Sequence, residues 1–154
     1  MKRILLLLMM IFTFSCFSAG KNEVKVINNT NYETIVKKEN NIIVYAAAWC
    51  PHCQEELENL SKIQDKLKNT KITVIMYPFI RSDKGYIDYE KETLEYINEK
   101  KYNFEFYLDK DREILEKLNL TSVPAVGVVK NGEIIKDVNV DEITIEKLLE
   151  IFGG

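Results

Sequence analysis

The chain of 154 residues is poor in the side chains that build metal sites and cross-linked scaffolds. It contains one histidine and three cysteines. A structural zinc ion takes four ligands, mostly cysteine and histidine, and His52 is the only histidine. Three cysteines are also too few for the disulfide framework that holds many small exported domains together. We therefore expect neither a resident metal nor a disulfide-stapled scaffold.

Charge of one sign is also lacking, because 21 basic residues face 24 acidic residues and the two kinds alternate along the chain. No basic segment with interspersed aromatic residues is present, so the sequence predicts no nucleic-acid partner. Internal repeats and low-complexity segments are absent as well. The length suits one domain with a full hydrophobic core.

Residues 1–20 have the pattern of an export signal, so we exclude them from the fold and assign 21–154 to the domain. Lys2 and Arg3 are followed by an apolar stretch from Ile4 to Phe14, which is short for a membrane span. Small residues follow at Ser15, Ser18, Ala19 and Gly20. The pattern predicts an extracytoplasmic location, in the periplasm or the cell envelope.

Cys16 leaves three alternatives open for the mature N-terminus. It is a candidate for the acylated cysteine of a bacterial lipoprotein, which would tether the domain to a membrane. Thr13 and Phe14 fit a lipoprotein signal poorly, and cleavage after Gly20 would release a soluble exported form. The third alternative is an uncleaved anchor. In every case the domain itself keeps only Cys50 and Cys53.

The most informative stretch is Trp49-Cys50-Pro51-His52-Cys53, which follows an apolar run and precedes residues that favour a helix. A helix N-terminus stabilises a thiolate on its first cysteine, because unpaired backbone N–H groups point at the sulfur. We predict that Cys50 is the nucleophile and that Cys53, one turn further on, resolves the mixed disulfide. The redox centre is then the Cys50–Cys53 disulfide itself, without a dissociable cofactor. A static disulfide and a metal site are the structural alternatives.

Three neighbours of the cysteines are candidates for tuning their redox potential: Pro51, His52 and Glu56. A partly positive imidazole at His52 would stabilise the Cys50 thiolate and favour an oxidising pair. Glu56 could relay protons to Cys53, or it could be one more surface residue in an acidic helix.

Hydrophobic periodicity predicts alternating strands and helices that end in a hairpin around Asn131-Gly132. Thr30 and Glu33 have the spacing of a capping box at the start of the first helix. The predicted strands are Val24–Ile27, Ile42–Ala47, Lys71–Tyr77, Phe104–Leu108, Ala125–Lys130 and Glu133–Asn139. The predicted helices are Asn31–Lys38, the one after the cysteines, an inserted one at Asp83–Lys101, one from Asp109, and a last one from Asp141 or Thr144. This order implies an α/β fold, with a mixed sheet and helices on both faces.

The cysteine motif after the second strand, with Val123-Pro124 before the hairpin, resembles the thioredoxin-like family. The resemblance covers about Val24 to Phe152. It implies that Pro124 is cis and packs against the disulfide, and that Val123 offers its backbone to a substrate segment. We expect Trp49 to pack beside the disulfide and shape the rim of the site, where it would contact substrate; packing in the core alone is the alternative.

The segment from Phe104 to Asp111, with the helix before it, looks like the helix–strand insertion of the TlpA/ResA branch of exported thiol–disulfide oxidoreductases. Glu56 matches a glutamate of that branch. Pro51-His52 and Val123 instead resemble oxidants of the DsbA type. The buried aspartate that many thioredoxins carry is replaced by Val44.

The resemblance implies an exported thiol–disulfide oxidoreductase that acts on protein thiols or disulfides and exchanges electrons with a membrane or soluble redox partner. The residues beside the cysteines favour an oxidising or isomerising role. The insertion favours the alternative, a reductase of apocytochrome c or other exported thiol proteins. A hypothesis of another class is a thioredoxin-fold module that binds a metal or a protein without turnover.

Overall fold

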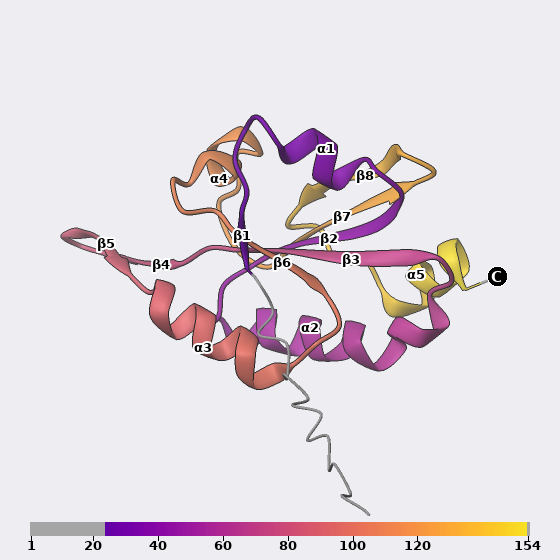
Figure 1. Ribbon diagram of the computed structural model, residues 1–154, viewed down its shortest axis with the longest axis horizontal. Coiled ribbons are helices and arrows are strands. Elements are labelled where there is room, and N and C mark those ends of the chain that lie inside the picture. The colour runs from indigo at the N-terminus through magenta and orange to yellow at the C-terminus, as the bar shows by residue number, and fades with distance from the viewer. Residues whose placement is uncertain (1–23, 154) are drawn as a thin grey trace, which may run out of the picture.

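The computed structural model describes residues 24–153 and has a six-stranded mixed sheet at its centre (Figure 1). The spatial order of the strands is β1-β6-β3-β2-β7-β8, with β1, β6, β3 and β2 parallel and β7 and β8 antiparallel to their neighbours. Their bounds are Lys25–Val26 (β1), Asn40–Ala46 (β2), Thr70–Met76 (β3), Glu105–Leu108 (β6), Ala125–Lys130 (β7) and Glu133–Asn139 (β8). The predicted α/β fold with a mixed sheet is therefore confirmed.

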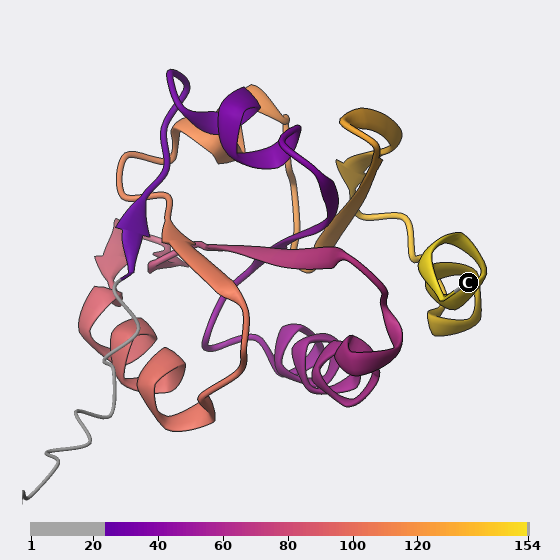
Figure 2. The same ribbon diagram turned by 45° about the vertical axis from the view of Figure 1, so that its right-hand side comes forward.

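Helices cover both faces of the sheet, as expected (Figures 1 and 2). The short helices α1 and α4 lie on one face, and α2 and α3 lie on the other, with α5 beside the far end of α2. Their bounds are Tyr32–Val36 (α1), Pro51–Ile63 (α2), Glu90–Lys100 (α3), Glu113–Lys117 (α4) and Ile145–Phe152 (α5). A 3₁₀ turn at Gln64–Lys66 follows α2. No helix within residues 24–153 is long and apolar enough to cross a membrane.

The central strand β2 is buried along almost its whole length, which explains its continuous apolar sequence. It pairs with β3 on one side and β7 on the other. Val44 is fully buried in this strand. Because β2 leads directly into the cysteine motif, a buried strand that is paired on both sides positions the start of α2.

The prediction of an inserted helix at Asp83–Lys101 is wrong for the first third of that range. Residues Phe79–Ser82 (β4) and Gly85–Asp88 (β5) form an antiparallel hairpin instead, and α3 begins only at Glu90. Gly85 has a φ of +120°, a conformation that only glycine adopts readily and that a helix cannot contain. The insertion is therefore a hairpin, a helix and the strand β6, which lies between β1 and β3.

The capping box expected at Thr30 and Glu33 is also wrong. Asn31 occupies the N-cap position of α1, but its side chain accepts no hydrogen bond from the backbone of the helix. The carboxamide oxygen of Asn28 accepts hydrogen bonds from Thr30 and from the Asn31 backbone, so the Thr30 hydroxyl is engaged outside the helix. Glu33 pairs with Lys37 along the helix.

The C-terminal part follows the sequence pattern closely. Asn131 and Gly132 both have positive φ and make the turn between β7 and β8, as predicted. The last helix begins after Thr144, whose hydroxyl accepts a hydrogen bond from the Lys147 backbone N–H at 3.2 Å. Leu148 and Phe152 bury the inner side of this helix.

Candidate redox-active site

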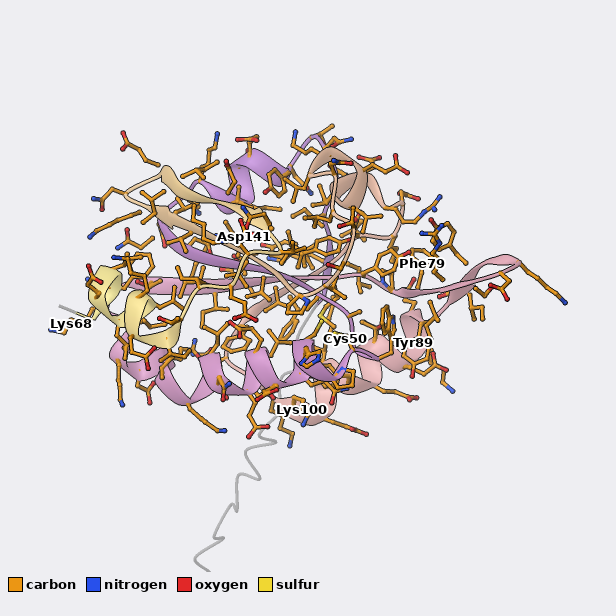
Figure 3. The ribbon with its side chains drawn as sticks, turned by 180° about the vertical axis from the view of Figure 1, so that it is seen from behind. Cys50, Lys68, Phe79, Tyr89, Lys100 and Asp141 are labelled. Carbon is orange, nitrogen blue, oxygen red and sulfur yellow. The ribbon has the colours of Figure 1, made fainter. Side chains whose placement is uncertain are left out.

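The two cysteines lie at the first turn of α2. Figure 3 labels Cys50 at the start of this helix. Cys50 is the N-cap residue, and its sulfur accepts a hydrogen bond from the Cys53 backbone N–H at 3.2 Å. Both thiols are free; Cys50 is 5% exposed and Cys53 is fully buried. This geometry aims the helix N-terminus at the Cys50 sulfur, where a thiolate would be stabilised.

Burial separates the two thiols chemically. Desolvation raises the pKa of the Cys53 thiol strongly, and the adjacent Cys50 raises it further. A buried thiol of this kind stays protonated at neutral pH. The arrangement suits the predicted division of roles, in which Cys50 reacts first and Cys53 follows.

The Val123–Pro124 segment lies directly beside the first cysteine, although 73 positions separate Cys50 from Val123 in the chain. The Cys50 thiol is 3.8 Å from the Val123 carbonyl oxygen, to which it donates a weak hydrogen bond. The Val123–Pro124 peptide bond is cis, as the sequence resemblance implied. Beyond this segment the chain enters β7, which is held in the sheet by β2.

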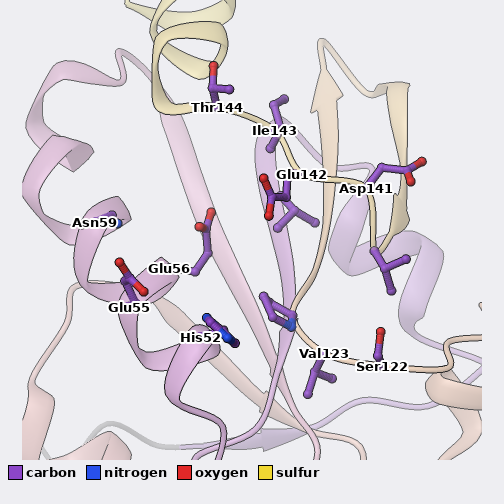
Figure 4. Close-up of a pocket in the computed structure, with 13 residues that line it drawn as sticks. His52, Glu55, Glu56, Asn59, Ser122, Val123, Asp141, Glu142, Ile143 and Thr144 are labelled. Carbon is purple, nitrogen blue, oxygen red and sulfur yellow. The ribbon is translucent and has the colours of Figure 1, made fainter.

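A cavity of about 450 Å³ opens between α2 and the loop that joins β8 to α5 (Figure 4). It brings together four residues that the sequence singled out: His52, Glu56, Val123 and Pro124. The cavity is further lined by Glu55, Asn59, Ser122, Val126, Val140, Asp141, Glu142, Ile143 and Thr144. Space for a bound segment therefore exists next to the cysteine pair.

Glu56 lies on the wall of this cavity and is half-buried. Desolvation raises the pKa of its carboxyl group, and the nearby carboxylates of Glu142 and Glu55 raise it further. These surroundings favour the protonated form of the carboxyl group more than water does. Its role in proton transfer remains a prediction.

Trp49 does not line the cavity and lies on the other side of the motif. Its indole Nε1 donates a 2.7 Å hydrogen bond to the Phe79 carbonyl oxygen, at the start of the β4–β5 hairpin. The side chain is 38% exposed. The ring of Phe79 packs edge-on against Tyr77 and Tyr86, with centroid distances of 5.5 and 6.4 Å. Trp49 therefore joins the redox motif to the insertion.

One buried carboxylate was missed by sequence reasoning. Asp109 is fully buried after β6, and it accepts hydrogen bonds from the Tyr45 hydroxyl at 2.8 Å and from the Ile114 and Leu115 backbone N–H groups. Desolvation raises the pKa of Asp109. Its oxygens are engaged in joining β2 to α4. The pattern at Asp109 did indicate a helix start, but α4 begins only after Arg112.

The loop residues Asp141 and Glu142 were also missed as site residues. No motif marks them, and only the fold brings this loop against α2.

Within residues 24–153 no group of three or more histidine, cysteine or acidic side chains is placed to hold a metal ion. The predicted export segment and Cys16 lie outside the described residues.

The sheet, the cis-proline segment and the cysteine pair at the start of α2 together define a thioredoxin-like protein. A profile of the AhpC/TSA family matches residues 16–138. The chain belongs to that family.

Several proteins similar to this chain are described as thioredoxins or thiol–disulfide oxidoreductases. The sporulation thiol-disulfide oxidoreductase A of Bacillus subtilis is 19% identical over 126 residues, which is 82% of this chain and 74% of the relative. The crystal structure of StoA from Bacillus subtilis is 22% identical with a TM-score of 0.56, covering 73% of this chain and 81% of StoA. An exposed lipoprotein thioredoxin from Streptococcus pneumoniae has 16% identity and a TM-score of 0.57, covering 77% of this chain and 86% of that structure.

Proposed function

We propose that this chain exchanges disulfides with protein substrates outside the cytoplasm through Cys50 and Cys53. The chain is a thiol–disulfide oxidoreductase of the TlpA/ResA type. The observation that carries the proposal is the Cys50 thiol, capped by α2 and placed 3.8 Å from the Val123 carbonyl oxygen. The candidate nucleophile and the backbone segment proposed to hold the substrate therefore meet at one point.

The exchange follows from this geometry. In the reducing direction the Cys50 thiolate attacks one sulfur of a partner disulfide, forms a mixed disulfide and releases the other partner sulfur as a thiolate. Cys53 then loses its proton and attacks the Cys50 sulfur. The Cys50–Cys53 disulfide forms, the second partner thiolate leaves, and two electrons have passed to the partner. The oxidising direction runs the same steps backwards.

Cys53 must lose its proton to act, and its surroundings oppose that loss. Glu56 is the proposed proton acceptor for this step, because it follows Cys53 by three residues on α2 and lines the cavity beside the motif. Asp109 is engaged with Tyr45 and α4, so it does not compete for this role.

The extracytoplasmic location is supported by the pattern of residues 1–20 and by the names of relatives. One similar structure is described as a pneumococcal exposed lipoprotein and another as a secreted Mycobacterium tuberculosis disulfide oxidoreductase. We propose residues 1–20 as an export signal and 21–154 as the exported domain, with Cys16 as the candidate for a lipid anchor. Cell fractionation of wild type and Cys16→Ala tests this, since an acylated Cys16 predicts membrane association that the variant loses.

For the direction of electron flow we propose an oxidising or isomerising role. The residue that motivates this direction is His52, which lines the cavity next to the cysteine pair: a positive charge placed near Cys50 would stabilise the reduced form and make the disulfide a stronger oxidant. A reductase of exported thiol proteins is the second candidate, supported by the insertion that contributes β6 to the sheet.

The function is tested by running the exchange in both directions with one peptide that contains two cysteines. Oxidised protein is mixed with the dithiol peptide, and reduced protein with the disulfide peptide, and the thiols are counted by alkylation and mass spectrometry. We expect two electrons to move per chain. The matched control is the double variant Cys50→Ser, Cys53→Ser. No transfer in either direction by the wild-type chain would refute the proposal and favour a non-catalytic binding module.

A further inference from the structure

The cavity beside the cysteine pair is rich in carboxyl groups. Its lining holds four carboxyl groups, at Glu55, Glu56, Asp141 and Glu142, with no lysine or arginine. Two of these residues come from α2 and two from the loop before α5. Figure 4 shows Glu56 and Glu142 extending toward each other from opposite walls. Negative charge is therefore concentrated where the fold leaves open space.

These carboxyl groups act on one another. The pKa of Glu56 is raised by burial, and the charges of Glu142 and Glu55 add to the effect. Apart from the imidazole of His52, the lining provides no basic side chain to balance them, and Lys136, which lies outside the lining, interacts with Asp141. Positive charge brought by a partner would relieve this repulsion and would be held in a partly desolvated space, where electrostatic attraction is stronger than in water.

The cavity is continuous with the redox site. Val123 and Pro124 form part of its wall, and the Val123 carbonyl oxygen contacts the Cys50 thiol. A polypeptide segment that presents its sulfur to Cys50 along Val123 would extend its neighbouring residues into the cavity. The acidic wall therefore faces the residues next to the substrate cysteine.

The carboxyl groups suit a chain better than a single ion. The described residues include no group of three or more acidic, histidine or cysteine side chains arranged to hold a metal. Carboxylates from two separate walls instead match several positive charges along an extended peptide.

We propose that this site selects protein substrates whose redox cysteine is flanked by lysine or arginine, with the basic residues held in the acidic cavity. The proposal rests on the exchange function proposed above. The acidic wall raises the local concentration of such segments and speeds their encounter with Cys50. Salt weakens the preference, because the charges at the mouth of the cavity are screened.

The test uses three symmetric disulfide peptides that differ only in the residues beside the cysteine, which are lysine, glutamine or glutamate. Reduced protein attacks each peptide, and the rate constant is divided by that of dithiothreitol with the same peptide, which removes differences in intrinsic reactivity. At low salt we expect the lysine peptide to react about tenfold faster than the glutamate peptide, within the range known for electrostatic steering. The ratio should fall toward one in about 1 M salt.

Two charge-matched variants locate the effect. The triple variant Glu55→Gln, Asp141→Asn, Glu142→Gln neutralises the cavity and leaves Glu56 in place, so we expect the ratio to fall to about twofold. The control variant Glu39→Gln, Glu116→Gln, Glu133→Gln removes three exposed carboxylates elsewhere and should keep the tenfold ratio. If the triple variant does not fold, Glu142→Gln alone, in an exposed loop, should lower the ratio in the same direction.

Each outcome has a distinct meaning. Equal normalised rates for the lysine and glutamate peptides with wild-type protein would overturn the substrate preference. A preference that survives neutralisation of the cavity would assign it to another surface and would also overturn the proposal. Failure of the glutamine peptide to exchange at all would instead refute the exchange function on which the preference rests.

Discussion

The indole Nε1 of Trp49 donates a 2.7 Å hydrogen bond to the carbonyl oxygen of Phe79. This bond joins the residue before Cys50 to the first residue of the β4–β5 hairpin. The hairpin projects from the body of the protein, and all four residues of β5 are exposed (Figure 1). The redox motif is thus attached to the base of a hairpin whose outer strand is exposed.

Trp49→Phe removes the donor of this bond and keeps an aromatic ring. We expect a loss of stability of about 1 kcal/mol, the usual net contribution of one hydrogen bond. Amide hydrogen exchange in residues 79–88 should become faster, because the hairpin loses its attachment to the motif. Phe79→Leu is the control, since it keeps the accepting carbonyl group. Unchanged protection of the hairpin in Trp49→Phe would contradict this account of the bond.

The positions of the two thiols predict different outcomes for their serine variants. Cys50→Ser should abolish exchange, because no nucleophile remains at the start of α2. Cys53→Ser should accumulate mixed disulfides with partners, because the second attack cannot occur. Mass spectrometry of trapped complexes measures this directly. Faster alkylation by iodoacetamide at Cys53 than at Cys50 in the reduced protein would reverse the assignment.

The raised pKa of Glu56 predicts a pH-dependent gain of stability in Glu56→Gln. A carboxyl group whose folded pKa exceeds its unfolded value destabilises the fold once the pH rises above the folded pKa. The variant should therefore melt about 2 °C higher than wild type near pH 8. Near pH 3.5 the two proteins should melt at the same temperature, because the wild-type carboxyl is then protonated in both the folded and the unfolded chain.

Glu58→Gln is the control on the same helix. Lys62 lowers the pKa of Glu58, so loss of that charge should not stabilise the protein near pH 8. The measurement is thermal unfolding across the pH range. A Glu56→Gln variant less stable than wild type at high pH would show that the carboxylate has a favourable partner.

Asp109→Ala should destabilise the fold by about 3 kcal/mol, because it leaves the Tyr45 hydroxyl and two N–H groups of α4 without their acceptor. Asp111→Ala changes an exposed neighbour and should have little effect. Urea unfolding of the two variants provides the comparison. Equal stability of both would mean that the buried carboxylate contributes nothing.

Much of this structure could be predicted from local sequence. The apolar run before Cys50 predicted the buried strand β2, and Asn131-Gly132 predicted the final hairpin, because both signals are local and strong. The β4–β5 hairpin was missed because its charged and aromatic residues also suit an amphipathic helix. The sequence signal for a turn in this segment was Gly85, which has a positive φ in the structure.

The candidate site was predictable only where a motif marks it. Cys50, His52 and Pro124 could be found from sequence. Asp141 and Glu142 could not, because an ordinary acidic loop becomes part of the site only when α5 and α2 come together in the fold. The hydrogen bond from Trp49 to the hairpin is likewise a product of tertiary packing.

His52 connects the site to the direction of electron flow. A positive charge at this position would favour the dithiol form of the pair, since a fall of one unit in the pKa of an attacking thiol corresponds to about 30 mV toward a stronger oxidant. Replacement by glycine in His52→Gly should therefore make the potential more negative. An unchanged potential in this variant would remove His52 from the account and favour the reductase.

The reduction potential of the Cys50–Cys53 pair tests the central claim most directly. The protein is equilibrated in a series of glutathione buffers, quenched, alkylated and weighed by mass spectrometry. We predict reversible interconversion of dithiol and disulfide by a two-electron curve, with a potential less negative than the approximately −270 mV of thioredoxin. A pair that does not interconvert would contradict the redox function itself, and a reversible potential near that of thioredoxin would contradict the oxidising role.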